Sequence, residues 1–168
     1  MPITAATASD LEILETQLGR TPRGVAGIGA RCICSRPLVV ATLPRLEDGT
    51  PFPTFFYLSS PQLVLHCSRL EAAGRMQDFQ RELTENASFA EAYTRAHYDY
   101  LTCREAHGQV PEIADVSAGG MPIRVKCLHA LVAHALAAGE GVNPVGDRVL
   151  AELAAQGTWV REKCHCHE

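Results

Sequence analysis

The sequence has no long hydrophobic run, no marked excess of one charge and no export signal. None of its apolar runs approaches the ~18 residues of a membrane-spanning helix. Lys and Arg number 15 against 19 Asp and Glu, a net charge of −4, which is unlike the basic surfaces that bind nucleic acid. The first residues, Met1 to Ala5, lack the basic and apolar regions of a signal peptide. We therefore expect a cytoplasmic protein that binds neither nucleic acid nor membrane.

Familiar catalytic signatures are also missing. The sequence contains no serine-nucleophile elbow and no His-Glu-x-x-His zinc motif. The glycines between residues 24 and 29 do not follow the spacing of a dinucleotide loop or a P-loop. Whether the protein is an enzyme is left open by these patterns, as is its oligomeric state.

Soft metal ligands are what the sequence does contain. Seven cysteines and seven histidines occur in 168 residues, and nine of these fourteen lie at residues 32–34, 127–134 and 164–167. An odd number of cysteines without an export signal indicates reduced thiols rather than a disulfide framework. Clustered thiols and imidazoles favour a metal site.

The residue pattern predicts one α+β domain over residues 1–160, followed by a Cys/His-rich tail at 161–168. Apolar stretches at 24–33, 38–43 and 53–58 are predicted strands, and their short links favour a small antiparallel sheet of about three strands. Five or six helices should cover this sheet. Their expected starts are Ser9, which opens a capping box and a docking helix, and Pro61, Met76, Asn86, Pro122 and Pro144.

The predicted helix that begins at Pro122 carries most of the reactive side chains. Its apolar stripe recurs at helical spacing, at Val125, Leu128, Val132 and Leu136. Cys127, His129 and His134 lie on the same predicted helix. The free N–H groups of its first turn, together with Arg124 and Lys126, are suited to an anion such as phosphate.

The central hypothesis is a metal site that joins this helix to Cys32 and Cys34. One intervening residue is tighter than the usual spacing of a zinc knuckle, but residues two apart on a strand face the same side. We expect Cys127 as the third ligand and His134 as the fourth, with His129 and His97 as competitors. Zinc suits such a set, and an iron–sulfur cluster is the alternative if the tail adds cysteines.

Basic side chains surround the predicted metal site. We expect a pocket for a small anionic ligand, lined by Arg31, Arg36, Arg45, Arg124 and Lys126. A metal-bound water beside these cations would suit a hydrolase that acts on a phosphate-bearing or other anionic small substrate.

The tail Cys164-His165-Cys166-His167 allows several interpretations. Four soft ligands near the end of the chain can bind metal on their own, or belong to a frayed end that collects metal adventitiously. The tail can also close the main site by donating Cys164 or Cys166.

Two further functions stay open. Cys127 with His129 or His134 is a candidate nucleophile and base of a metal-free cysteine enzyme, and Asp99 or Asp147 is suited to orienting the histidine. The second open function is a non-enzymatic module that is stabilised by a structural metal and works through a protein partner. Such a module requires a closed site in which four protein ligands fill the coordination of the metal.

Several phrases of the sequence resemble an actinobacterial family known as domain of unknown function 501. They are Arg31–Cys34, Pro44–Thr54, Tyr57–Pro61, Gly120–Ala130 and Gly141–Asp147. The resemblance implies a cytoplasmic bacterial protein, often encoded near a septum-formation protein and an exopolyphosphatase-like protein, so the partner it suggests is related to cell division or polyphosphate. It implies no established activity. A cysteine often stands in the family where this chain has Ser60, which argues against position 60 as an obligatory ligand.

Overall fold

Three antiparallel strands form the sheet on which the helices pack. In the computed structural model, which describes residues 3–166, they are β1 (Val25–Arg31), β2 (Pro37–Thr42) and β3 (Phe56–Leu58), in the order β1-β2-β3. Six α-helices and one 3-10 helix, η1 (Pro111–Ile113), complete the part of the chain that is described. The predicted α+β class with a small antiparallel sheet is therefore confirmed.

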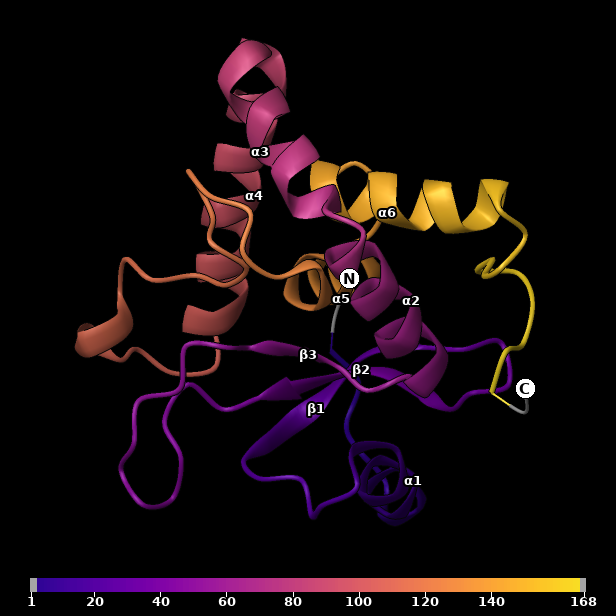
Figure 1. Cartoon of the computed structure of the whole chain (residues 1–168). Helices are drawn as coiled ribbons and strands as arrows, with labels where there is room; N and C mark the ends of the chain where they lie inside the picture. Colours follow the sequence, from indigo (N-terminus) through magenta and orange to yellow (C-terminus); the bar gives the residue numbers. More distant parts are fainter. Residues whose placement is uncertain (1–2, 167–168) are drawn as a thin grey trace.

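Helix α1 (Ala8–Leu18) covers one face of the sheet, and the other helices lie on the opposite side (Figure 1). Leu14, Ile28 and Val40 form a small apolar cluster beneath α1. The helix starts earlier than the sequence suggested, because Thr7 is its N-cap and forms a capping box with Asp10. The prediction of a capping box that begins at Ser9 was therefore wrong.

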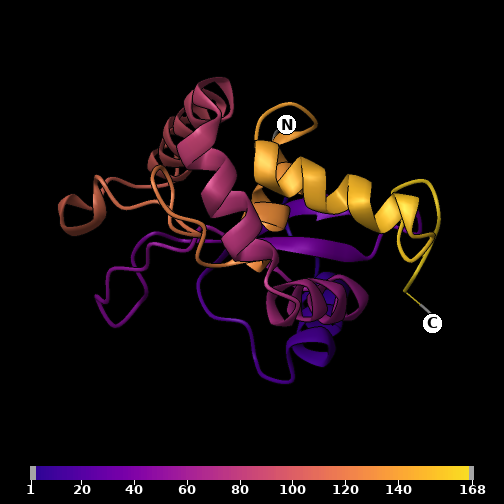
Figure 2. The ribbon, with the colours of Figure 1, turned by 45° about the horizontal axis from the view of Figure 1, so that its top comes forward.

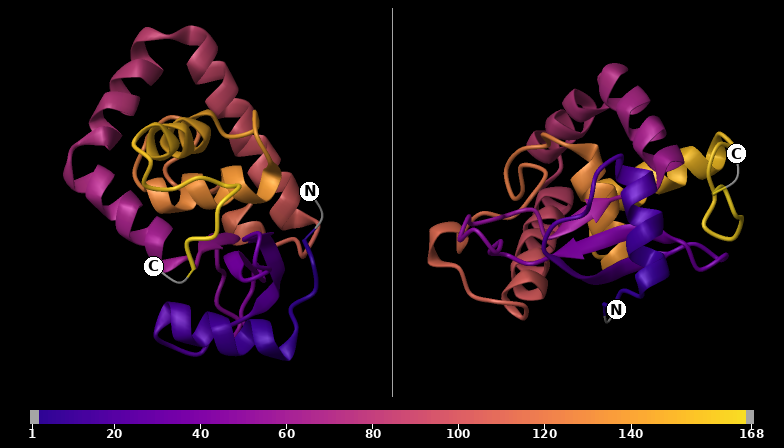
Figure 3. Two further views of the ribbon diagram at one scale, coloured as in Figure 1. Left: turned by 90° about the vertical axis from the view of Figure 1, so that its right-hand side faces the viewer. Right: turned by 90° about the horizontal axis from the view of Figure 1, so that it is seen from below.

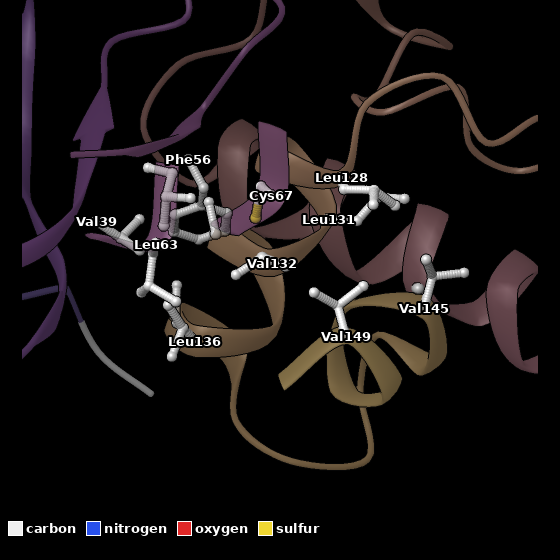
Figure 4. Packing of buried hydrophobic residues seen from close by; sticks show 14 of the residues in the cluster. Val39, Phe56, Leu63, Cys67, Leu128, Leu131, Val132, Leu136, Val145 and Val149 are labelled. Atoms are coloured by element: carbon white, nitrogen blue, oxygen red, sulfur yellow. The ribbon is translucent and has the colours of Figure 1, made fainter. Parts of the chain in front are cut away.

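Helix α5 (Leu128–Ala138) lies at the centre of the main core. It contacts all three strands, α2 and α6, and the residues Leu131 to Ala137 are all buried. Figure 4 shows Leu131, Val132 and Leu136 packed among side chains of the sheet, α2 and α6. A helix that is apolar on every side belongs in such a position.

The start of α5 corrects the sequence-based prediction. Cys127 is its N-cap and Leu128 its first residue, whereas the residues from Gly119 to Lys126 form turns and irregular backbone. Pro122 lies in a turn that spans residues 119–123 rather than at a helix start. Arg124 and Lys126 therefore precede the helix instead of lying in its first turns.

Helices α2 (Pro61–Ala72), α3 (Arg75–Glu85) and α4 (Ala87–Glu105) form a frame around α5 and α6 (Pro144–Ala155) (Figure 3). Helix α6 lies over α5 on the side away from the sheet (Figure 2). Asn86 and Asn143 cap α4 and α6 with their side chains. Both helices begin beside the starts predicted at Asn86 and Pro144, and Pro61 and Pro144 occupy first helical turns, as the sequence predicted. In residues 3–166 no helix is both long and apolar enough to span a bilayer.

Asp10 ties α1 to the sheet, and its removal should destabilise the protein. Its carboxylate accepts two hydrogen bonds from Arg31 at 2.7 and 2.9 Å while the side chain is almost fully buried. Asp10→Asn should lower the free energy of unfolding by about 1–3 kcal/mol near neutral pH, because Arg31 would lose the charge that balances its own. Urea denaturation measures this, and Asp78→Asn, which removes an exposed ion-paired carboxylate, should have a much smaller effect.

The ion pair of Asp10 and Arg31 also makes the stability of the protein depend on pH. The Arg31 guanidinium, with help from Thr7, holds the pKa of Asp10 well below its ordinary value of 3.8. A depressed carboxyl pKa stabilises the folded state fully above the ordinary value and progressively less below it. The stability difference between wild type and Asp10→Asn should therefore be constant above about pH 5 and shrink as the pH falls from about 5 to about 3. A difference that stays constant over that range would contradict the role of the carboxylate.

Gly146 is the contact point between α5 and α6. A Cβ at this position would overlap the backbone carbonyl of Leu131 and crowd Ala135. Alanine normally favours a helix interior over glycine by roughly 1 kcal/mol, but forced overpacking costs about 1–3 kcal/mol. Gly146→Ala should therefore lower the melting temperature by about 2–8 °C in a chain of this size. A variant that melts higher than wild type would show that the two helices can separate without cost.

Candidate functional site

Four thiols from two distant segments meet at the end of the β1–β2 hairpin. Cys32 and Cys34 lie in the turn after β1, and Cys164 and Cys166 lie in the tail after α6. Their four sulfur atoms all lie within 4.8 Å of one another. Figure 1 shows the tail descending from α6 beside the hairpin.

The hairpin turn, rather than strand alternation, brings Cys32 and Cys34 together. The Cys32 N–H donates to the Arg36 carbonyl at 2.9 Å, and the Ser35 N–H donates to the Cys32 carbonyl at 2.8 Å. Ser35 has a positive φ of 68°, which lets the chain reverse tightly between the thiols and β2. The strand predicted through residue 33 therefore ends at Arg31.

The tail is folded against the domain through residue 166. Trp159 and His165 are buried, and their ring centroids lie 6.0 Å apart. The Val160 N–H donates to His165 Nε2 at 3.1 Å, which folds the segment back on itself. This turn points Cys164 and Cys166, on either side of the buried His165, toward the hairpin. His167, a predicted soft ligand, lies outside the described residues.

The thiols influence one another strongly. Burial acts to raise the pKa of Cys34, but hydrogen bonds from the Arg36 backbone and from the three other thiols outweigh it and lower that pKa to about 7. Burial and the neighbouring thiols raise the pKa of Cys166 far above its ordinary value. Four sulfurs this close cannot all carry a negative charge unless a cation lies between them.

The donor set fits one thiophilic ion. Tetrahedral bonds of about 2.3 Å to zinc place sulfur atoms roughly 3.8 Å apart. Separations of up to 4.8 Å need only a small contraction to reach that value. The four-thiol cluster, meaning Cys32, Cys34, Cys164 and Cys166, therefore could hold a metal ion.

A second cluster, the Glu71 cluster, lies at the start of α5 and consists of Glu71, Cys127 and His129. One ligand atom from each residue lies within 4.8 Å of the others. His129 Nδ1 lies 3.1 Å from Glu71 Oε1 and 3.9 Å from Cys127 Sγ. The hydrogen bond with Cys127 raises the pKa of His129 to about 9, against burial and with help from the Glu71 charge.

The Glu71 cluster borders a cavity of about 1070 Å³. Its wall combines the β3 edge with the segment 115–130 and includes Phe56, Leu58, Arg124, Lys126, Cys127 and His129. The buried Arg104 holds part of this wall by donating to the carbonyls of Ile113 and Val116. Tyr93 donates to the Arg124 carbonyl at 2.9 Å and fixes another part. The cavity is large enough for a small molecule.

The structure divides the predicted set Cys32, Cys34, Cys127 and His134 among three places. In residues 3–166 no cluster joins Cys127 or His134 to the two hairpin thiols. His134 is fully buried: its Nε2 lies 2.9 Å from Asp99 Oδ1, and Asn143 Nδ2 lies 3.1 Å from its Nδ1. It thus connects α5 with α4 and α6. His97 was a weaker candidate for the fourth ligand, and its Nδ1 lies 2.8 Å from Ser117 Oγ.

The predicted anion-binding residues are separated in the same way. Arg124 and Lys126 are exposed and line the cavity. Arg31 pairs with Asp10, and Arg45 pairs with Glu112 at 2.7 Å. Arg36 lies in the hairpin turn with the four-thiol cluster, away from the cavity lining. The N–H of Leu128 donates to Glu71 at 2.7 Å, so a carboxylate already occupies the helix start proposed for an anion.

Glu71 was not among the ligands predicted from the sequence, and the tail was ranked below Cys127 as a source of ligands. Glu71 occurs on an ordinary amphipathic helix 56 positions before Cys127, and no local pattern marks it. The tail did carry a signal, because Cys164-x-Cys166 repeats the one-residue spacing of Cys32-x-Cys34.

Fold and clusters together define an α+β protein with a thiol site suited to a metal ion. The chain belongs to the family described as "Protein of unknown function (DUF501)", whose model matches residues 28–151. The match includes both hairpin thiols and the whole Glu71 cluster, and ends before Cys164. No curated protein and no solved structure matches the chain.

The thiol environments predict a wide spread of reactivity in reduced, metal-free protein. Cys34 is exposed with a pKa of about 7, whereas burial raises the pKa of Cys67 to about 12. Near neutral pH, Cys34 should react with iodoacetamide at least about 100-fold faster than Cys67, because the thiolate is the nucleophile. Time-resolved peptide mass spectrometry measures both rates. Comparable rates would mean that the hairpin thiols are not arranged as described.

Proposed function

We propose that this chain is a zinc protein in which the four-thiol cluster binds one structural ion. The observation that carries the proposal is the convergence of four sulfur atoms from two segments about 130 residues apart. Apolar packing alone does not explain why four thiols gather at one point. A metal ion with four thiolate ligands does.

The ion would fasten the tail to the sheet. The residues from Thr158 to Cys166 form turns and irregular backbone rather than a helix or strand. Short segments of this kind near a chain end are normally poorly ordered unless something ties them down. Trp159 packs one end of the segment into the core, and the metal would hold the other end against the hairpin.

Zinc is favoured over an iron–sulfur cluster. Sulfur atoms within 4.8 Å of one another leave space for one ion rather than several irons. Four sulfur ligands in tetrahedral arrangement are typical of structural zinc sites, and iron in a single-ion site is the alternative. Reduced thiols in these numbers support a cytoplasmic location.

The large cavity gives the protein a place to bind a small anionic ligand. Arg124 and Lys126 are the exposed cations of its lining, and Phe56, Leu58 and Val64 supply an apolar wall. A cavity that combines apolar walls with a few polar groups is the usual form of a small-molecule site. The function supported best is thus that of a zinc-stabilised protein that binds an anionic small molecule.

Metal analysis of tag-free protein tests the zinc proposal. Cys34→Ser and Cys166→Ser should each lose one equivalent of zinc relative to wild type, because a closed site with three thiolates binds far more weakly. Cys103→Ser, which replaces a half-buried thiol outside both clusters, should retain the wild-type content. Mass spectrometry of the native protein and elemental analysis measure the difference.

Two outcomes would overturn the proposal. One is an unchanged zinc content in both Cys34→Ser and Cys166→Ser. The other is a pair of disulfide bonds among the four cysteines in protein purified under reducing conditions.

A further inference from the structure

We propose that Glu71, Cys127 and His129 form a second metal site, with an open coordination position that faces the cavity. This site has three protein ligands instead of four, which is the arrangement of catalytic rather than structural zinc. The proposal is independent of the four-thiol cluster, because the two sites share no residue: one lies at the start of α5 and the other at the hairpin turn.

The separations of the ligand atoms fit one ion. Tetrahedral zinc places a nitrogen and an oxygen ligand about 3.3 Å apart, and a nitrogen and a sulfur ligand about 3.6 Å apart. The observed separations from His129 Nδ1 are 3.1 Å to Glu71 Oε1 and 3.9 Å to Cys127 Sγ. Each differs from the expected value by a few tenths of an ångström.

The nitrogen of His129 that faces away from Glu71 and Cys127 forms hydrogen bonds, as the second nitrogen of a metal-bound histidine usually does. His129 Nε2 lies 3.2 Å from the Val64 carbonyl and 3.2 Å from Ser68 Oγ. A carbonyl only accepts hydrogen bonds, so Nε2 carries the proton. Without a metal, Nδ1 also carries a proton and donates to Glu71 Oε1, and a bound ion would take the place of this proton between the nitrogen, the oxygen and the nearby Cys127 sulfur. A cation among the three atoms would satisfy all of them.

A cysteine–histidine catalytic pair fits this geometry less well. In a nucleophile–base–carboxylate arrangement the nucleophile and the carboxylate contact opposite nitrogens of the imidazole. Here Glu71 and Cys127 both approach Nδ1, and a backbone carbonyl occupies the other side. The metal-free cysteine enzyme is therefore the less favoured alternative.

Surrounding contacts hold the ligands in place before any ion binds. Glu71 Oε1 accepts the Leu128 N–H at 2.7 Å, which fixes the carboxylate beside the helix start. Gln80 bonds the backbone on both sides of Arg124, accepting from the Val125 N–H and donating to the Ile123 carbonyl. A site supported by such a network is preorganised for its ion.

The cavity indicates the class of ligand. Cys127 and His129 line it, and so do Lys126 and Arg124. An oxyanion can therefore reach the open position of the metal and the two cations together. A metal-bound water there could hydrolyse an anionic ester: its oxygen would bond to the electrophilic phosphorus or carbon, the ester bond would break, and the proton of the water would pass to the leaving oxygen. This reaction needs no oxidant or reductant.

Zinc stoichiometry tests the second site. Wild-type protein stripped with a chelator and reloaded with zinc should bind two ions per chain. His129→Ala and Glu71→Gln should each bind one, and Glu71→Gln keeps an acceptor for the Leu128 N–H, so its fold should be unchanged. His107→Ala, which removes an exposed histidine outside the site, should bind two. A zinc content that is the same in wild type, His129→Ala and Glu71→Gln would overturn the proposal.

The variants also separate the two proposals. Cys34→Ser should lose one ion, and the double variant Cys34→Ser/Glu71→Gln should lose both. If Cys34→Ser keeps both ions while Glu71→Gln loses one, the four-thiol proposal fails and the second site stands. If the losses are reversed, the second site fails and the four-thiol proposal stands.

Cobalt and inorganic phosphate test the open position. The visible spectrum of cobalt-loaded wild type minus that of cobalt-loaded His129→Ala isolates the second site. Phosphate should change this difference spectrum, and Lys126→Ala should weaken the phosphate affinity roughly tenfold, about the effect of one hydrogen bond to a charged group. A difference spectrum that saturating phosphate leaves unchanged would contradict the open position.

Discussion

The burial of α5 on every side is the constraint on which the rest of the structure depends. The strands cover it from one direction, α2 from the side and α6 from the opposite direction. Gly146 lets α6 approach the α5 backbone closely, and Gly29 lets the sheet approach Ala137 in the same way. A helix packed so closely has no freedom to slide, so the position of its first residue is fixed, and with it the position of the segment directly before it.

Glu71 determines which side chains gather around Leu128, the first residue of α5. Its carboxylate accepts the Leu128 N–H, where the positive end of the helix favours a negative charge. The contact places Cys127 and His129 beside α2. The preceding segment forms part of the cavity wall, and Gln80 of α3 and Tyr93 of α4 hold it by hydrogen bonds. A buried structural requirement, the capping of α5, thereby produces a concentration of metal ligands at the edge of a cavity.

The sequence specified the elements better than it specified how they meet. Apolar alternation, Asn86 and Asn143 as caps, and proline at Pro61 and Pro144 are local signals, and each led to the correct helix or strand. Pro122 misled because proline suits a tight turn as well as a helix start, and residues 119–123 form such a turn. The pairing of ligands depends on contacts between distant segments, so His134 was placed with thiols from which the fold separates it.

The two clusters differ in the way that structural and catalytic metal sites differ. The four-thiol cluster offers four like ligands from a turn and a tail, and it leaves an ion no vacant side. The Glu71 cluster offers three unlike ligands at the wall of a cavity that holds two exposed cations. A protein that needed metal only for stability would gain little from the second arrangement, since a half-buried carboxylate, thiol and imidazole beside a cavity stabilise less than packed apolar side chains would. Three unlike, half-buried metal ligands at the wall of a cavity are the physical reason to look for the protein's chemistry at the start of α5.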